Sequence, residues 1–174
     1  MLSVRAPKTM VDLPELQRGR RVAALREAMT DASIDSFLTS DSISLRWLSG
    51  FTGSSGVLLV TDEHMHLLTD GRYGEQAPRE TVGTGIDVCI GDRKRHKEVI
   101  EDKLSSARSL ALESDRITWG EVEALKESVE IELVSAKGLL SDLRRVKEPG
   151  EVVRLQAAAT IADEALATVC SDLA

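Results

Sequence analysis

Residues 57–70 read VLLVTDEHMHLLTD, which is the clearest local signal in this chain of 174 residues. Two apolar runs, 57–61 and 65–69, are separated by only three polar residues. Short apolar runs with a tight polar connection are typical of two antiparallel β-strands joined by a turn. We therefore predict a β-hairpin over this stretch.

On either side of the hairpin, strands alternate with helices. Four more apolar segments have the length of strands: 36–39, 86–90, 109–112 and 131–134. The segments between them predict short helices at 41–50, 70–80, 94–107, 118–128 and 137–144. Asp41 and Gly50 suit the two ends of the first of these helices, and Thr118 with Glu121 forms a capping box for the fourth. This alternation predicts a three-layer α/β/α domain with a mixed sheet of about six strands.

Before the first strand, residues 12–31 predict a helix. Asp12 suits its N-cap and Pro14 an early position. Its apolar residues recur at helical spacing: Leu16, Val22, Leu25, Ala28 and Met29.

The pattern breaks at residues 146–150, where Pro149 suits the start of a new helix. We place a domain boundary here, between residues 1–146 and 147–174. The apolar residues that follow keep helical spacing: Val152, Leu155, Ala158, Ala159, Ala162, Ala165, Leu166 and Val169. If this face left about 300–400 Å² bare, burying it would contribute at most about 8–10 kcal/mol. The helix therefore needs a partner, which is its own domain, a missing domain or a second copy.

Composition excludes several classes of function. A formal net charge of −7 gives no summed positive field for nucleic acid or an anionic membrane. The chain has neither an apolar run of signal-peptide length at its start nor the roughly 20 apolar residues of a membrane span. Cys89 and Cys170 stand far apart without metal-binding spacing. We expect a cytoplasmic protein with both cysteines reduced and structural.

The glycine-rich segment Gly50–Gly56 (GFTGSSG) is the first candidate for function. Its small residues allow unusual backbone angles and a close approach to a ligand. It matches neither the serine-hydrolase motif G-x-S-x-G nor a phosphate-binding P-loop. A structural turn is the alternative reading.

A second candidate, Asp70-Gly71-Arg72-Tyr73, follows the hairpin directly. It places a bidentate donor, Arg72, and the chain's only tyrosine at a strand end, where α/β folds present ligands. The alternative is a structural salt bridge made by Asp70 or Arg72.

Two histidines in the hairpin, His64 and His66, superficially resemble a metal-binding pair. We prefer a solvated strand face for them, with Met65 and Leu67 buried on the other face. The chain supplies no complete set of nucleophile, base and orienting group, so we predict no catalytic residue.

Three segments resemble, in order and spacing, the N-terminal region of Xaa-Pro aminopeptidases and Xaa-Pro dipeptidases: 50–54 (GFTGS), 68–73 (LTDGRY) and 143–151 (LRRVKEPGE). The resemblance covers the chain from about Leu16, and the third segment is similar to the family's junction between two domains. It implies a creatinase/prolidase N-terminal domain, ribonuclease H-like in fold, over residues 1–146. Residues 147–174 would then be the linker and first helix of a truncated catalytic domain.

In such proteins the second domain holds two divalent metal ions (Mn, Co or Zn) on two aspartates, a histidine and two glutamates. No residue here matches them, so the resemblance implies no metal, cofactor or catalytic residue in this chain. Because hydrolysis in this class needs a metal-activated water, we predict that the chain is inactive alone.

The family uses its first domain for oligomer contacts and for shaping the mouth of the active site. The resemblance therefore implies these gate or interface candidates: Phe51, Thr52, Gly53, Ser54, Ser55, Arg72 and Tyr73. The implied partners are the chain's own catalytic domain and further copies, in a homodimer or larger oligomer. Two other functions stay open: a stand-alone module that binds protein or peptide, and a serine hydrolase using Ser54 or Ser55 with His64 or His66.

Overall fold

The computed structural model describes residues 13–173. These residues belong to two units, of which Arg18–Arg145 is one and segments 13–17 and 146–173 form the other. The predicted capping residue Asp12 lies outside the described residues.

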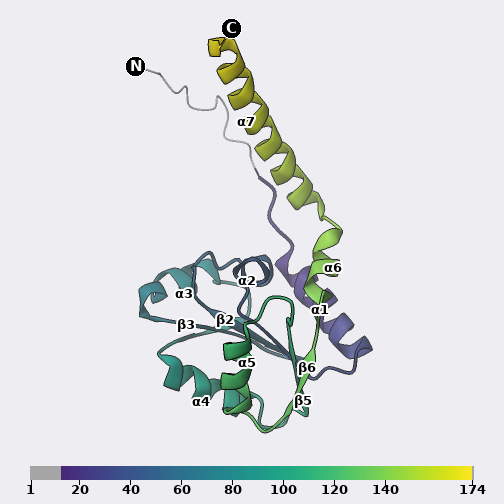
Figure 1. Ribbon diagram of the computed structural model, residues 1–174, viewed down its shortest axis with the longest axis vertical. Helices are drawn as coiled ribbons and strands as arrows, with labels where there is room; N and C mark the ends of the chain where they lie inside the picture. Colours follow the sequence, from purple (N-terminus) through teal and green to yellow (C-terminus); the bar gives the residue numbers. More distant parts are fainter. Residues whose placement is uncertain (1–12, 174) are drawn as a thin grey trace. The chain divides into compact units, whose positions relative to one another are not determined.

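The α/β unit is built on a six-stranded mixed sheet (Figure 1). Its strands are β1 (Ser36–Thr39), β2 (Val57–Thr61), β3 (Met65–Thr69), β4 (Ile86–Ile90), β5 (Ser109–Leu112) and β6 (Glu132–Ser135). They lie in the order β4-β3-β2-β1-β5-β6, with β2 antiparallel to both neighbours and all other pairs parallel. The predicted sheet is confirmed.

Helices cover both faces of this sheet (Figure 1). The helical segments are α1 (Arg18–Asp31), α2 (Ser42–Ser49), the 3-10 turn η1 (Gly71–Tyr73), α3 (Gln76–Glu80), α4 (Arg93–Lys103), α5 (Trp119–Lys126) and α6 (Leu139–Arg145). Side chains of α1, α2, α3 and α6 share one apolar cluster with the sheet, and side chains of α4 and α5 share the other. The three layers are therefore those that the sequence predicted.

Alternating side chains explain how the strands fill both clusters. Phe37, Leu58 and Leu67 enter the cluster of α1 and α2, whereas their neighbours Leu38 and Leu59 enter the cluster of α4 and α5. Because successive side chains of a strand point to opposite faces, a strand covered on both faces is a continuous apolar run. The predicted hairpin is confirmed, and the N–H of Thr61 closes its turn by donating to the carbonyl of His64 (2.9 Å).

The first helix begins at Arg18, so the prediction of a helix from residue 12 was wrong at this end. A helix begun at residue 12 would satisfy the N–H of Gln17 within its own backbone. Instead this N–H donates to the carboxylate of Glu148 (3.1 Å). The carbonyl of Pro14 likewise accepts from the guanidinium of Arg154. Residues 13–17 are therefore held by contacts with residues 146–173 and not by helical hydrogen bonds.

The preferred interpretation of His66 was also wrong, because its side chain is buried and only 5% exposed. His64 is exposed as expected, and Met65 and Leu67 are buried as expected. The sheet has a second helical layer on the side of His66, so this face of the hairpin is not solvated. Burial of a ring between two apolar layers favours its neutral form.

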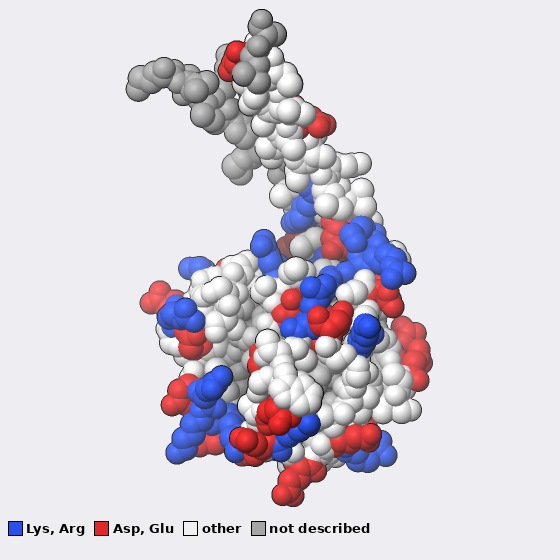
Figure 2. Space-filling view, viewed as in Figure 1, with Lys and Arg blue, Asp and Glu red and all other residues white. Residues whose placement is uncertain are grey.

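The second unit contains α7 (Pro149–Leu173), which begins at proline as predicted. Several of its apolar side chains are exposed: Val152, Leu155, Ile161, Leu166 and Val169. Within residues 13–173, no helix is both long and apolar enough to cross a membrane. On the visible face of the α/β unit, acidic and basic side chains are interspersed (Figure 2).

Candidate functional site

Strand direction brings the two candidate segments to one edge of the sheet. Five strands run the same way, so their carboxyl ends share this edge, where η1 follows β3. Segment 50–56 precedes β2, which runs in the opposite direction, and therefore reaches the same edge. Carboxyl ends of parallel strands are where α/β folds place their ligands.

The glycine-rich segment begins where α2 ends. Gly50 has φ of 81°, in the left-handed region, and its N–H donates to the carbonyl of Arg46 (2.9 Å). This arrangement closes the helix and turns the chain toward β2. Gly53 is needed for space, because a Cβ there would lie 2.2 Å from the ring of Phe51. The segment therefore packs tightly against its own aromatic side chain.

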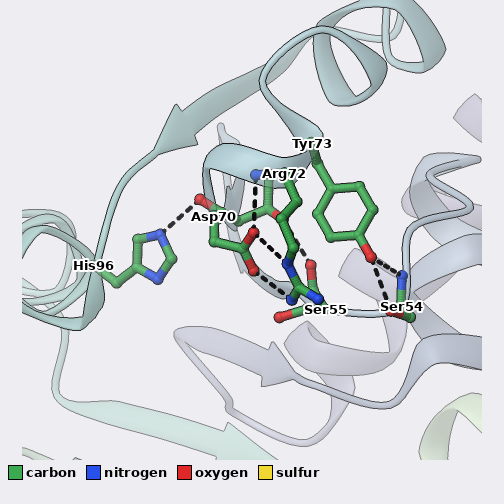
Figure 3. Close-up of polar contacts among 7 residues, drawn as sticks. Ser54, Ser55, Asp70, Arg72, Tyr73 and His96 are labelled. Atoms are coloured by element: carbon green, nitrogen blue, oxygen red, sulfur yellow. Dashed lines mark hydrogen bonds and ion pairs between the residues drawn. The ribbon is translucent and has the colours of Figure 1, made fainter.

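Aromatic contacts join segment 50–56 to η1. Phe51 is 1% exposed and meets the ring of Tyr73 edge to face, with centroids 5.3 Å apart. The N–H of Ser54 donates to the Tyr73 hydroxyl (3.0 Å), and the two hydroxyls share a second hydrogen bond of 2.8 Å (Figure 3). The hydrogen bonds from Ser54 lower the pKa of Tyr73. Because Phe51 is buried, it supports this surface from below.

Two further side chains fix the ends of the segment. Glu80 of α3 accepts from both the N–H and the hydroxyl of Thr52 (2.8 Å each). Burial raises the pKa of Glu80, but the hydrogen bonds from Thr52 and Gln76 outweigh it, so the pKa is lowered. At the other end, the hydroxyl of Thr69 donates to the carbonyl of Ser55 (2.6 Å). Segment 50–56 is therefore held in place at both ends, and we call this anchored segment the wall.

Asp70 and Arg72 form the structural ion pair that was the alternative reading. The guanidinium donates from Nε and Nη2 to the two carboxylate oxygens (2.9 and 2.8 Å), and the Arg72 N–H also donates to Asp70 (3.0 Å; Figure 3). These bonds from Arg72 hold the pKa of Asp70 well below its usual range. The Arg72 side chain is still 66% exposed and lies over the ring of Tyr73. The guanidinium can thus pair with Asp70 and at the same time present a positive charge to solvent.

His96 supports this edge from α4, and it was not predicted as a site residue. Its Nε2 lies 3.0 Å from the carbonyl of Thr69, the residue before Asp70 (Figure 3). The N–H of Gly91 donates to the same carbonyl (2.9 Å). Glu80 and Gln76 were missed as well. The Asp92 cap sets the start of α4 and so places His96 in its first turn, but the partner of His96 is not local in sequence.

The serine-hydrolase alternative has no geometric support for Ser54 with His64, and His66 is buried, only 5% exposed. The hairpin pairs Val57 with Leu68 and Val60 with Met65, so Ser54 and His64 lie beyond opposite ends of it. Five residues of strand separate those ends by about 16 Å, too far for a nucleophile and its base. Among the described residues, no group of three or more His, Cys, Asp or Glu side chains is placed to hold a metal ion.

Comparisons with known proteins match most of this chain. A family model described as the creatinase/prolidase N-terminal domain matches residues 21–146. The chain is 28% identical over 146 residues to an uncharacterized peptidase, YqhT, of Bacillus subtilis, covering 83% of this chain and 41% of that protein. The chain therefore spans less than half the length of this curated relative.

Two solved structures have the same fold. One is an Xaa-Pro dipeptidase from Bacillus anthracis, 31% identical with a TM-score of 0.81, covering 89% of this chain and 43% of that one. The other is the N-terminal domain of the cytoplasmic peptidase PepQ from Mycobacterium tuberculosis, 32% identical with a TM-score of 0.64, covering 71% of this chain and 98% of that one. A domain of this kind has thus been solved by itself.

Proposed function

Since the chain belongs to the creatinase/prolidase N-terminal domain family, we propose that it is the non-catalytic first domain of an Xaa-Pro metallopeptidase and that it shapes the mouth of the active site. The match of residues 21–146 to that domain carries the proposal. The dinuclear metal centre and the hydrolytic chemistry then belong to a second domain, with residues 147–174 as the linker and first helix leading to it. That domain and further copies of the protein are the proposed partners, in the cytoplasm.

The anchored wall supports this role. Thr52 and Ser54 are exposed at the carboxyl edge of the sheet, and Arg72 adds a positive charge beside them. Hydrogen bonds and ring contacts fix the wall from three directions, through Glu80, Thr69 and Tyr73. A surface held this way keeps its shape when a substrate or a second subunit contacts it, and pre-organised contact surfaces lose little entropy on binding. The proposed contact residues are Thr52, Gly53, Ser54, Ser55, Arg72 and Tyr73, with Phe51 beneath them.

Kinetics of the complete gene product test this role. Arg72→Ala removes the exposed positive charge beside the wall. We therefore expect KM for short Xaa-Pro peptides to rise about tenfold with little change in kcat. A change in oligomeric state would equally assign Arg72 to a subunit contact. Light scattering on the same samples reads that state.

Arg108→Ala is the matched control. Arg108 is 87% exposed and forms a similar two-pronged pair with Asp35, with distances of 3.2 and 3.0 Å, just before β5 at the opposite edge of the sheet. This variant loses the same kind of ion pair without touching the wall. Equal KM values and oligomeric states for wild type and both variants would contradict the proposed role of the wall.

A further inference from the structure

Strands β1 and β5 lie side by side and parallel, but the chain leaves them in different directions. The helix after β1, α2, packs in the apolar cluster on one face of the sheet, and the helix after β5, α5, packs in the cluster on the other face. Adjacent strands whose connections diverge in this way form a topological switch point, where open α/β sheets bind ligands. The candidate wall lies elsewhere on this edge, at β2 and β3.

A buried carboxylate stands at this switch point. Glu113 directly follows β5 and is 2% exposed. Both of its oxygens accept from hydroxyls: Thr39, at the end of β1, donates to Oε2 (2.8 Å), and Ser44, in the first turn of α2, donates to Oε1 (2.9 Å). The N–H of Asp41 in turn donates to Thr39 Oγ1 (3.1 Å), which fixes that hydroxyl. The carboxylate is therefore held by groups from β1 and α2.

A guanidinium faces this carboxylate. Arg144, in the last turn of α6, has a side chain that is only 16% exposed. Its Nη1 donates to the Ser44 hydroxyl (2.6 Å) and lies 4.0 Å from Glu113 Oε1. Ser44 thus accepts from the arginine and donates to the glutamate. An unpaired buried carboxylate is costly, and Glu113 is compensated by two hydroxyl donors together with the nearby guanidinium.

We propose that the switch point of this sheet is a guanidinium-binding site and that the chain fills it with its own Arg144. Glu113 supplies the charge, and two hydroxyls accept from the guanidinium: Ser44 from Nη1 (2.6 Å) and Ser141 from Nη2 (3.4 Å). The bound group joins the first turn of α2 to the last turn of α6. Because α2 leads directly into segment 50–56, this contact positions the wall relative to the end of the α/β unit at Arg145. The site is independent of the proposed peptidase role.

Chemical rescue tests the site in the 174-residue chain. Arg144→Ala empties it, and we expect the thermal midpoint to fall by about 5–10 °C. Methylguanidinium at about 10 mM then restores at least half of that loss, since a ligand that binds the folded state stabilises it. Methylammonium at the same ionic strength restores none, because it lacks the planar set of donors.

Two control variants separate this result from a general effect of the additive. The double variant Arg144→Ala, Glu113→Gln retains the cavity without the charge and gains nothing from methylguanidinium. Arg108→Ala loses an exposed guanidinium and gains nothing either. Rescue of equal size in either control, or none in Arg144→Ala, would overturn the proposal. If Arg144→Ala does not fold without an additive, it is refolded once with methylguanidinium and once with methylammonium. Equal folded yields with the two additives would overturn the proposal.

Hydrogen exchange tests the positioning role of the same contact. Glu113→Gln should raise amide exchange both in α2 (Ser42–Ser49) and in α6 (Leu139–Arg145), and leave the hairpin of β2 and β3 protected. Exposed Glu130→Gln is the control, and it should change neither helix. Loss of protection in only one of the two helices, or in neither, would contradict the coupling of α2 to α6.

Discussion

Phe37 in β1 and Leu166 in α7 are apolar side chains with opposite surroundings. Phe37 is fully buried in the cluster between the sheet and α1 and α2, whereas Leu166 is 63% exposed. The same contrast holds between the two regions: the α/β unit contains two apolar clusters of its own, and α7 exposes apolar side chains along its length. In Figure 2 most of the visible α7 surface is neither acidic nor basic. The α/β unit thus has its own core, whereas α7 leaves several of its apolar side chains exposed.

The largest expected effect is the loss of a core ring from the α/β unit. Phe37→Ala leaves a cavity between β1 and its helices, so we expect the free energy of unfolding to fall by about 3–5 kcal/mol. Urea denaturation followed by circular dichroism measures it. Leu155→Ala in α7 is the matched control, because Leu155 is 56% exposed and should change stability by less than about 0.5 kcal/mol. Comparable losses of stability in the two variants would contradict the contrast between a buried core in the α/β unit and exposed side chains in α7.

A smaller loss is expected at the wall. Gly53→Ala forces the new Cβ into the rings of Phe51 and Tyr73, which must shift, and we expect a loss of about 1–3 kcal/mol. Near-ultraviolet circular dichroism should show the altered environment of Tyr73. At Gly71, in the neighbouring η1, a Cβ meets nothing within 4 Å, so Gly71→Ala serves as the control. A wild-type spectrum and stability for Gly53→Ala would show that the wall is not tightly packed.

Acid should weaken the α/β unit through His66. Burial lowers the pKa of His66 below its ordinary 6.5, and Asp87 of β4 opposes this only in part; Lys103 and His64 lower it further, and Asp102 raises it. An imidazole with the lower pKa in the folded chain binds its proton more readily when unfolded. The free energy of unfolding therefore falls as the pH drops through 6.5, and the loss is complete below the folded-state pKa of His66.

Urea denaturation at several pH values between 8 and 5 measures the free energy of unfolding across this change. The range includes the pH at which an ordinary histidine titrates, about 6.5. His66→Leu keeps the site apolar and should reduce the acid-side loss relative to wild type. His64→Gln removes the exposed histidine in the turn of the same hairpin and should keep most of this acid-side loss. An unchanged pH dependence in His66→Leu would contradict this assignment.

The smallest effect is expected in α7. Leu166→Gln should change the stability of the 174-residue chain by less than about 0.5 kcal/mol, because the side chain is already exposed. In a longer gene product that covers this face, the same change should cost about 2 kcal/mol, the value of burying a leucine. Thermal unfolding of both proteins measures the difference. A large loss in the 174-residue chain would mean that α7 already has its partner.

Strand and helix positions were predictable where the signal is local. The apolar runs at 57–61 and 65–69, the cap of Asp41 and the capping box of Thr118 act within a few residues, and all are present. The start of α1 was not predictable, because contacts of Gln17 with Glu148 compete with a helical start. The burial of His66 depends on which helices cover the second face of the sheet, and no pattern near residue 66 records it.

The candidate site likewise contains residues that could be predicted from local sequence and residues that could not. Its residues in segments 50–56 and 70–73 were found from glycine spacing, strand ends and a resemblance. Their anchors Glu80 and His96 were not found, because each meets its partner about 27 residues away in sequence through the fold. Glu113 and Arg144 are more distant still, and a lone glutamate after a strand carries no sign of its arginine. Polar contacts between residues this far apart in sequence can be predicted only once the topology of the sheet is known.

The intact mass of the protein produced from its native gene tests the central claim most directly. If α7 is the first helix of a catalytic domain, the mass should lie far above the 18.9 kDa of this chain. A mass near 18.9 kDa would contradict the assignment to a larger metallopeptidase, and would favour a stand-alone binding module of the same fold.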